Sequence, residues 1–452
     1  MKKFRHAPAR FTILQLALAI TGASWHWAGA AGPEAGFTSL FDGKTLTGWT
    51  LVGKHGDGYG VTNGAIYCAR GGGGNLFTEK EFADFVLRFE FREEDANNGV
   101  GIRAPLSLET AYLGMEIQIL DDVAADRGKW GKALRPAQYH GSVYDLVPAK
   151  RGALKAPGEW NEEEITAQER HIRVVVNGKT IVDTDLNDIT DPVALMKHPG
   201  LLRDRGHIGF LGHNDYIEFR NIRVQELPAE EKENSPPEGF VALFNGKDLS
   251  GWKGLLARPN DNPANRAKLP PDKLAEEQAK ADQRMVEHWK AENGEIVFNG
   301  KGDSLCTKKD YADFEMLVDW KIPPRGDSGI YLRGSPQVQI WEPESPGHFN
   351  PPDGSGGLYN NEKPGNPRHP LKVADKPVGE WNRFRIIMSG EKIHVYLNGE
   401  LVVRATTLEN YWERDKPIYS SGQIELQNHG GPLWFKNVYI RELATKTAEG
   451  GK

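Results

Sequence analysis

The segment from Gly36 to Trp49 reads GFTSLFDGKTLTGW, and a second segment, from Gly239 to Trp252, reads GFVALFNGKDLSGW. The two segments have the same length, and most of their glycine, phenylalanine, leucine, lysine and tryptophan residues stand at matching positions. Internal similarity of this kind sets the number of structural units in a chain. A chain of 452 residues is too long for one ordinary core and suits two domains of roughly 200 residues each.

The similarity continues in the same order through both halves of the chain. The matching stretches are 83–85 with 312–314, 98–103 with 328–333, 117–119 with 338–340, 141–144 with 356–359, 158–161 with 379–382, 177–178 with 398–399 and 206–221 with 422–437. The period far exceeds the roughly 20–50 residues of a solenoid repeat. We therefore predict a tandem duplication of a whole domain, with copies over 36–227 and 239–443 and a charged, proline-containing linker over 228–238.

The overall composition is that of a soluble globular protein, with 38% hydrophobic and 26% charged residues. The formal net charge is -6, whereas nucleic-acid binding needs clustered basic surface. No signature of a Ser-His-Asp site, a phosphate-binding loop or a zinc-binding histidine pair is recognisable. We therefore expect no nucleic-acid partner.

Residues 1–31 have the pattern of a signal peptide. An apolar stretch over 11–20 precedes a cleavage-like Ala28-Gly-Ala30, and it follows the basic residues Lys2, Lys3, Arg5 and Arg10. This stretch is too short to cross a membrane core of about 30 Å, and no later segment is long and apolar enough. The mature protein is therefore predicted to be periplasmic or secreted. Export permits a disulfide, but Cys68 and Cys306 lie at non-equivalent positions of the repeats, so two isolated buried thiols are expected.

Within each repeat the pattern is that of β-structure. Residues 85–91, 172–176 and 392–397 alternate apolar and polar residues or are rich in β-branched ones. Asn177-Gly178 and Asn398-Gly399 lie between such runs, which is a strong hairpin signal. Many short strands with almost no helix indicate a sandwich or a barrel.

One segment breaks the symmetry of the two repeats. Residues from about 257 to 288 have no counterpart in the first repeat, and 273–287 are rich in Ala, Glu, Lys and Gln after Pro270-Pro271. This composition predicts a short helix. We interpret the insertion as a solvated decoration, with a lid over a cleft as the alternative.

The motifs of both repeats resemble those of a known family. Besides the two openings, they are GMEIQILD at 114–121, YADF at 311–314, DSGI at 327–330 and LQNHG at 426–430. They are similar to the family described as 3-keto-disaccharide hydrolases, or 3-keto-glucoside 1,2-lyases and 3-keto-2-hydroxy-glucal hydratases. The resemblance covers nearly all of the mature chain, twice. It implies an all-β fold of two tandem concanavalin A-like jelly-roll β-sandwiches, with a keto-sugar site on the concave face.

Strand periodicity indicates which side chains share one face, because alternate residues of a strand point to opposite sides. When the apolar residues are directed inward, polar residues of several strands share the outward side. In the first repeat these are Glu90, Arg103, Glu116, Gln118 and His213; in the second they are Asp319, Tyr331, Arg333, Gln337, Gln339, Trp341, Glu425, Gln427 and His429. Asp121, Tyr144, Glu342 and Tyr359 complete the candidate set.

The reaction implied by the resemblance needs particular groups. A ketone at C3 of a glucosyl unit acidifies the C2 proton, a base removes it, the C1 substituent leaves, and water later adds. This requires a base, a donor for the enolate oxygen and an acid for the leaving oxygen. Glu116, Asp121 or one of His213 and His429 are candidates for the base, and Arg103 or Arg333 for holding the enolate. A divalent metal is another way to polarise the ketone, although no metal-spacing motif is present.

Plainer roles remain open for each of these residues. Arg103 and Arg333 can pair with Glu90 and Asp319, the histidines can bond nearby loops, Asp121 and Asp122 can end a strand, and Tyr144 and Tyr359 can be core rings. The two copies have also diverged, since Leu211 of the first repeat corresponds to Gln427 of the second, and Glu116 corresponds to Gln337. We favour the first repeat as the catalytic one. The alternatives are a glycosidase with two carboxylates, such as Glu116 and Glu90, and a non-catalytic tandem carbohydrate-binding protein.

Overall fold

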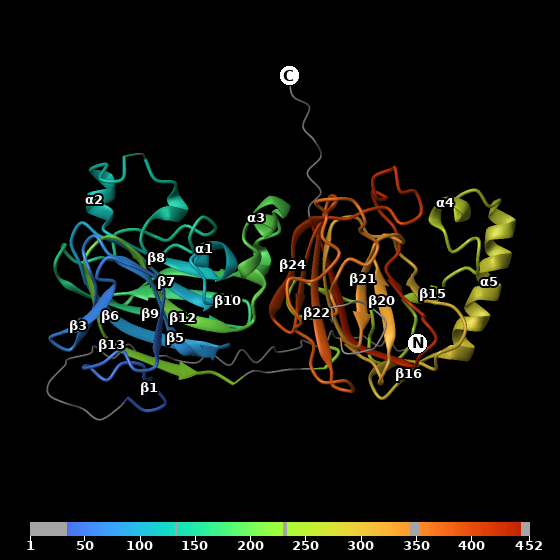
Figure 1. The fold of residues 1–452 in the computed structure, drawn as a ribbon, viewed down its shortest axis with the longest axis horizontal. Coiled ribbons are helices and arrows are strands. Elements are labelled where there is room, and N and C mark those ends of the chain that lie inside the picture. Colours follow the sequence, from blue (N-terminus) through green and yellow to red (C-terminus); the bar gives the residue numbers. More distant parts are fainter. Residues whose placement is uncertain (1–33, 132, 229–232, 344–352, 444–452) are drawn as a thin grey trace, which may run out of the picture. The chain divides into compact units, whose positions relative to one another are not determined.

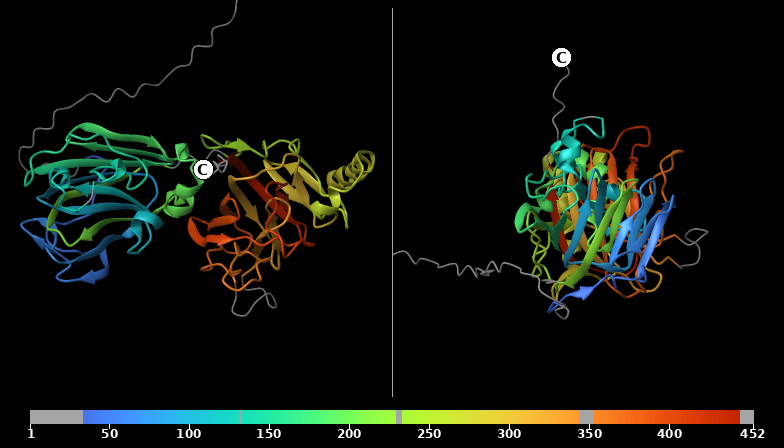
Figure 2. Two further views of the ribbon diagram at one scale, coloured as in Figure 1. Left: turned by 90° about the horizontal axis from the view of Figure 1, so that it is seen from above. Right: turned by 90° about the vertical axis from the view of Figure 1, so that its left-hand side faces the viewer.

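The computed structural model describes residues 34–131, 133–228, 233–343 and 353–443. The described residues from Phe37 onward belong to one compact unit. Within it, each sequence repeat forms an eight-stranded and a five-stranded sheet, and the strands of each repeat lie in two layers (Figures 1 and 2). The prediction of an all-β fold built from two sandwiches is thereby confirmed. The predicted signal peptide and part of the linker lie outside the described residues.

In the first repeat the eight-stranded sheet has the order β11-β10-β9-β6-β13-β4-β3, with β1 paired to β13, and the five-stranded sheet has the order β2-β5-β12-β7-β8. Neighbouring strands are antiparallel. The bounds are β1 Thr38–Ser39, β2 Trp49–His55, β3 Tyr59–Thr62, β4 Ala65–Cys68, β5 Gly73–Phe82, β6 Phe85–Glu93, β7 Asn97–Ala104, β8 Met115–Leu120, β9 Trp160–Gln168, β10 His171–Val176, β11 Lys179–Asp185, β12 Gly206–His213 and β13 Ile217–Glu226.

The second repeat has the same topology, strand for strand. Its eight-stranded sheet has the order β16-β17-β26-β19-β22-β23-β24, with β14 paired to β26, and its five-stranded sheet has the order β15-β18-β25-β20-β21. The bounds are β14 Val241–Ala242, β15 Trp252–Gly254, β16 Trp289–Glu292, β17 Glu295–Phe298, β18 Leu305–Thr307, β19 Phe314–Lys321, β20 Asp327–Tyr331, β21 Gln337–Trp341, β22 Asn382–Ser389, β23 Lys392–Leu397, β24 Glu400–Thr407, β25 Glu425–Leu426 and β26 Leu433–Glu442.

The core of each repeat lies between its two sheets, as strand alternation predicts. In β6 the residues Phe85, Leu87, Phe89 and Phe91 are buried, and the residues between them are partly exposed. Trp49 of the opening motif stacks on Phe210 of β12, and Trp252 is buried in the equivalent core. Truncating one such aromatic side chain to alanine costs about 3–5 kcal/mol. The conserved spacing of the two openings thus reflects a packing requirement that both repeats share.

Helices are short and few among the described residues. The α-helices are α1 Thr110–Leu113, α2 Asp122–Asp126, α3 Pro192–Lys197, α4 Pro263–Arg266 and α5 Pro271–His288, and the 3-10 turns are η1 Pro136–Gln138, η2 Leu186–Asp188 and η3 Pro199–Leu202. The hairpin turns follow the sequence signal, since Asn177-Gly178 and Asn398-Gly399 both have positive φ angles.

The insertion of the second repeat contains α4 and the expected helix, α5, which lies beside strand β15 (Figure 1). Gly254 of β15 donates its N–H to Asp282 Oδ1 at 3.0 Å, and Gln278 Nε2 donates to the Gly254 carbonyl at 2.9 Å. A Cβ atom at Gly254 would lie 2.2 Å from the Ala281 carbonyl oxygen, so glycine permits this close approach. Because β15 is an edge strand, α5 covers backbone groups that an unprotected edge would expose.

Residues of the two repeats also bond directly to each other. Glu315 is fully buried and accepts hydrogen bonds from Arg385 Nε at 2.6 Å and Arg441 Nε at 2.5 Å. Arg385 also contacts Asp204 of the first repeat at 3.2 Å. Burial opposes ionisation of Glu315, but the surrounding guanidinium groups outweigh it and lower its pKa to about 2. Separating the repeats would break the contact between Arg385 and Asp204 beside this buried cluster, so experiments on function are best made on the full chain.

Both cysteines are buried free thiols, as predicted. No helix in the described part of the chain is both long and apolar enough to cross a membrane.

Candidate functional site

The side of a five-stranded sheet that points away from the core, here called the outer face, carries a row of polar side chains in the first repeat. In β8, Ile117 and Ile119 enter the core, so Glu116 and Gln118 lie on the outer face. Gly99 and Gly101 of β7 stand opposite Gln118 and Glu116. A Cβ atom at Gly99 would lie 2.2 Å from Glu116 Oε1. Glycine at this position therefore allows the Glu116 side chain to lie across β7, toward β12.

Glu116 and His213, at the end of β12, form an ion pair. His213 Nε2 lies 3.9 Å from Glu116 Oε1, and the imidazole is 49% exposed whereas the carboxylate is almost fully buried. The neighbouring Glu116 carboxylate raises the pKa of His213, and Asp215 adds a smaller contribution in the same direction. We call Glu116 and His213 the first dyad; it combines a carboxylate and an imidazole, which are the usual groups of acid–base catalysis.

Three further polar residues surround the first dyad, and sequence periodicity did not single them out. Asn97 at the start of β7 donates its N–H to Asp215 Oδ2 at 3.0 Å, and its side-chain oxygen accepts from Gln118 Nε2 at 2.8 Å. Lys129 Nζ lies 3.3 Å from Asp215 Oδ1. Asn97 lies on the same face of β7 as Gly99, so strand alternation could have identified it. Lys129 and Asp215 lie in loops, where no periodic signal exists.

The remaining part of this outer face is apolar. Phe77 of β5, Ala104 of β7 and Leu211 of β12 form a small buried cluster against Val52 of β2. The segment that contains α1 covers this part, since Asn75 Nδ2 donates to Thr110 Oγ1 at 3.2 Å. Leu211 thus occupies an apolar contact, and its counterpart in the second repeat is the polar Gln427.

The second repeat carries a related arrangement with its carboxylate on a different strand. His429 Nδ1 lies 3.2 Å from Asp327 Oδ2, and Gln339 Nε2 donates to Asp327 Oδ1 at 2.8 Å. We call Asp327 and His429 the second dyad. Asp327 stands at the position of Asn97, and Gln337 stands at the position of Glu116. Carboxylate and amide have therefore exchanged places between neighbouring strands.

On the outer face of the second repeat, Glu425 is buried and interacts with charges of the insertion, Arg266 and Asp261. Glu425 of β25 pairs with Tyr331 of β20 in register, and Oε1 of Glu425 has no hydrogen-bond partner in the described structure. A Cβ atom at Gly334 would lie 3.3 Å from Glu425 Oε1 and 3.8 Å from Arg266 Nη2, so this α4 side chain lies near the carboxyl, and its charge acts to lower the pKa of Glu425. Burial raises the pKa of Glu425 to about 7. The insertion is accordingly more than a solvated decoration.

The structure corrects the interpretation of Arg103 and Arg333. Both have positive φ angles, which interrupts the alternation on which their outward placement rested. Arg103 is buried and donates to Asp84 at 2.8 Å and to the carbonyls of Ala83 and Glu169. Arg333 likewise donates to Asp313 at 2.7 Å. The two arginines join strand ends to neighbouring loops, and neither of them belongs to a dyad.

Glu90 and Asp319 were also misplaced by the sequence argument. They belong to β6 and β19 of the eight-stranded sheets, so they lie on the opposite side of each sandwich from the dyads. Glu90 bonds Arg220 at 2.7 Å and Asp319 bonds Arg383 at 2.6 Å, not Arg103 and Arg333. A two-carboxylate site of Glu116 and Glu90 is therefore excluded. The prediction failed because alternation shows which face of a sheet a side chain lies on, but not which sheet the strand joins.

The remaining candidates have structural partners. Asp121 is the N-cap of α2, where Oδ1 accepts from the N–H groups of Val123 and Ala124 and Oδ2 accepts from Asp95. Asp121 therefore has the strand-ending role that was its alternative, and not the predicted role of a base. Glu342 Oε2 accepts from the Arg325 N–H at 2.6 Å, Tyr144 accepts from Gln138 at 3.0 Å, and Trp341 is buried beside the partly exposed ring of Tyr359.

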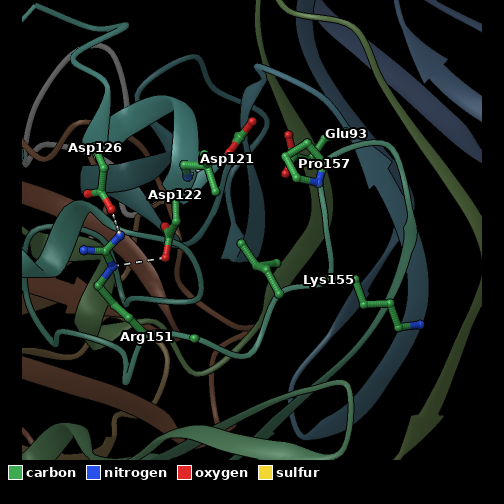
Figure 3. Close-up of a pocket in the computed structure, with 10 residues that line it drawn as sticks. Glu93, Asp121, Asp122, Asp126, Arg151, Lys155 and Pro157 are labelled. Atoms are coloured by element: carbon green, nitrogen blue, oxygen red, sulfur yellow. Dashed lines mark hydrogen bonds and ion pairs between the residues drawn. The ribbon is translucent and has the colours of Figure 1, made fainter.

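A cavity of 450 Å³ opens at the end of the first sandwich, where β6 and β8 end (Figure 3). Its lining residues are Glu93, Asp121, Asp122, Val123, Asp126, Arg151, Gly152, Leu154, Lys155 and Pro157. Of these residues, only Asp121 and Asp122 were candidates from the sequence. Glu93 was missed because it continues the inward row of β6, where an apolar residue is expected.

Among the described residues, no three His, Cys, Asp or Glu side chains are grouped as ligands for a metal ion. The two dyads each supply one carboxylate and one imidazole, so the side chains present do not fit a protein-bound divalent metal. We derive no step through a metal.

Comparison with known proteins places this geometry in a family. The model of the 3-keto-alpha-glucoside-1,2-lyase-like domain matches residues 36–225 and 239–441. The chain belongs to this family. A 3-keto-disaccharide hydrolase of Bacteroides thetaiotaomicron is 28% identical over 230 residues, which cover 42% of this chain and 79% of the relative. The resemblance inferred from the motifs is confirmed, and each repeat is one domain of the family.

Two solved structures are each similar to less than half of this chain. A protein of Parabacteroides distasonis assigned to the glycosyl hydrolases is 26% identical, covering 42% of this chain and 99% of that protein with a TM-score of 0.36. The carbohydrate-binding module CBM66 of Bacillus subtilis is 13% identical, covering 40% of this chain and 98% of the module with a TM-score of 0.27.

Proposed function

We propose that this carbohydrate-active family member cleaves 3-keto-glycosides, and that the first dyad of Glu116 and His213 is its catalytic centre. Family membership supports the substrate class. The observation that carries the residue assignment is the carboxylate–imidazole pair at 3.9 Å on an open strand face, with the imidazole half exposed. A substrate ring lying on this face would meet an acceptor and a donor of protons side by side.

In the proposed elimination, the Glu116 carboxylate takes the proton from C2 of the 3-keto-glucosyl unit. The electron pair forms an enolate with the C3 ketone and then the C1–C2 double bond as the C1–oxygen bond breaks. The leaving oxygen takes a proton from the His213 imidazolium, and the products are the unsaturated keto-sugar and the free aglycone. The raised pKa of His213 supports this role, because it keeps the imidazole protonated to higher pH.

Water completes the net hydrolysis by adding its oxygen at C1 and a proton at C2. By microscopic reversibility, the same two side chains suit this addition: His213 now accepts a proton from the attacking water, and the carboxylic acid of Glu116, after exchanging its proton with solvent, delivers one to C2. Gln118 and Asn97 are positioning residues that hold the β7 and β8 edges of the site together.

The reaction is tested on the full chain with a 3-keto-disaccharide, 3-keto-trehalose, in deuterium oxide. Elimination followed by hydration places deuterium at C2 of the released 3-keto-glucose, whereas direct hydrolysis leaves hydrogen there; a sample without enzyme corrects for spontaneous exchange. Glu116→Gln is expected to abolish both aglycone release and C2 labelling. Full release without labelling would refute the elimination mechanism, and full activity of Glu116→Gln would refute the residue assignment.

A non-catalytic carbohydrate-binding protein is the second candidate, and the second repeat favours it. There Gln337 replaces Glu116, and both oxygens of Asp327 already have partners in Gln339 and His429. Retained binding of the 3-keto-disaccharide with no turnover by the full chain would support this alternative.

We also propose that the mature chain is exported. The basic start, the apolar stretch over 11–20 and Ala28-Gly-Ala30 support this proposal. N-terminal sequencing of the chain from cell fractions tests it: a mature start near residue 31 or 32 in the periplasm or medium is expected, and an intact Met1 in the cytoplasm would contradict it.

A further inference from the structure

Glu93 is an acidic residue at a position that the fold fills with an apolar one. It continues the buried row Phe85, Leu87, Phe89 and Phe91 of β6. In the second repeat the equivalent residue is Ile322, which is 4% exposed and belongs to the core. Packing therefore does not require a carboxyl at this position, and burying one is unfavourable unless it has a partner.

The Glu93 carboxyl is incompletely satisfied within the described structure. Glu93 is 5% exposed, and its Oε2 atom has no hydrogen-bond partner among the described residues. Burial raises the pKa of Glu93 to about 8, and the charges of Asp121, Asp122 and Asp95 act in the same direction. At neutral pH the group is therefore a carboxylic acid that has a proton to donate.

The cavity beside Glu93 offers both kinds of hydrogen-bonding group. On the side opposite Glu93, Arg151 bonds Asp122 at 3.2 Å and Asp126 at 2.7 Å (Figure 3). Lys155 also lines the cavity and donates to the Trp160 carbonyl at 2.8 Å. Apolar surface comes from Val123, Leu154 and Pro157.

This lining suits a neutral polyhydroxylated ring better than an ion. Besides Glu93 the lining holds the carboxylates of Asp121, Asp122 and Asp126 and the cations Arg151 and Lys155, so neither charge is in large excess. Hydroxyl groups both donate and accept, and the ring faces of a sugar are apolar. The volume of 450 Å³ lies within the range of about 300–1,000 Å³ that is typical of small-molecule sites.

We propose that the cavity lined by Glu93 and Arg151 is a carbohydrate-binding subsite that holds one neutral glycosyl unit, with the Glu93 carboxylic acid donating to a sugar oxygen. It lies at the end of the sandwich and is separate from the outer face that carries the first dyad. The inference does not depend on the proposed catalysis, because binding is measured without turnover.

The test is calorimetric and NMR titration of the full chain at pH 7 with three neutral disaccharides, trehalose, maltose and cellobiose. We expect saturable binding of at least one of them, weakened about tenfold or more by Glu93→Ile, which copies the second repeat, and by Arg151→Ala. Arg220→Ala is the matched control, because Arg220 is a similarly exposed arginine that bonds Glu90 on the eight-stranded sheet and does not line the cavity; it is expected to bind as the wild type does. Circular dichroism and thermal unfolding establish that Glu93→Ile is folded, and Arg151→Ala changes only a partly exposed side chain.

The pH dependence gives a second, independent readout. Wild-type affinity is expected to fall as the pH rises above about 8, because ionised Glu93 no longer donates. Glu93→Gln retains a donor at every pH, so its affinity is expected to stay level from pH 7 to 9. The proposal is overturned by absence of saturable binding to all three sugars, by binding that survives both cavity substitutions, or by binding that Arg220→Ala weakens to the same extent. None of these outcomes bears on whether 3-keto-glycosides are cleaved.

Discussion

The two repeats share every strand, yet their outer faces differ in where one carboxylate stands. The first repeat has Asn97 on β7 and Glu116 on β8, and the second has Asp327 and Gln337 on the equivalent strands. In both, a histidine lies beside the carboxylate, at 3.9 Å and 3.2 Å; His213 ends β12, and His429 follows β25. A dyad can therefore be built from either strand, because Glu116 extends across β7 toward β12 and Asp327 lies on the strand next to β25.

The difference lies in what else each carboxylate does. Asp327 is held by both Gln339 and His429, whereas Glu116 faces His213 across a glycine that leaves room for it. On the second outer face, Arg266 of the insertion also lies near the buried Glu425 carboxyl. These features favour turnover in the first repeat and binding or a structural role in the second.

The largest expected effect comes from neutralising each carboxylate in turn. Glu116→Gln is expected to lower kcat for a 3-keto-disaccharide about 100- to 10,000-fold, as for loss of an acid–base group, while Asp327→Asn leaves kcat close to that of the wild type. Steady-state kinetics of the full chain measure both. A larger loss in Asp327→Asn would move catalysis to the second repeat.

The next effect concerns a feature in which the repeats agree. Arg103→Ala and Arg333→Ala each leave a buried aspartate unpaired, at Asp84 or Asp313, and are expected to lower the free energy of unfolding by about 3–5 kcal/mol. Urea denaturation measures the change. Arg127→Ala, which breaks an exposed pair with Asp95, is the control and should cost less than about 1 kcal/mol. Similar small losses for all three variants would show that the buried pairs are not structural.

Glu425 should make the stability of the second repeat depend on pH. The equivalent residue of the first repeat, Gly209, has no side chain to titrate. The carboxyl of Glu425 ionises near pH 4.5 in the unfolded chain and near pH 7 in the fold. The folded state thus holds the proton more tightly, so stability from this group is present below pH 4.5 and is lost as the pH rises to about 7. Relative to the wild type, Glu425→Gln is expected to gain up to about 3 kcal/mol over this window. Unfolding curves at pH 4.5, 5.5, 6.5 and 7.5 measure it, and a difference independent of pH would contradict the assignment.

The smallest expected effect is a displaced titration of one histidine. Because Glu116 raises the pKa of His213, Glu116→Gln should let His213 lose its proton at lower pH than in the wild type. The ring proton shifts of His213 followed by NMR report this, with His429 as an internal control. An unchanged His213 titration would show that the two side chains of the first dyad do not interact in solution.

Several sequence predictions held because they depend on local regularities. The duplication, the β-strands, the hairpins at Asn177-Gly178 and Asn398-Gly399, and the placement of Glu116, Gln118 and Gln339 on one face all follow from spacing along the chain. The prediction for Arg103 and Arg333 was wrong because a positive φ angle turns the side chain, and polarity does not reveal such an angle. The prediction for Glu90 was wrong because two strands with the same alternation belong to different sheets.

The sequence by itself determined that this protein has two copies of one β-sandwich domain, which strand faces are polar, and which family the copies belong to, since repeats and alternation are properties of neighbouring residues. Only the tertiary structure decided that His213 pairs with Glu116 and His429 with Asp327, that Arg103 holds Asp84, and that Glu93 lines a cavity. These contacts join strands and loops far apart in the chain, and their partners are set by sheet order and packing, which no local pattern encodes.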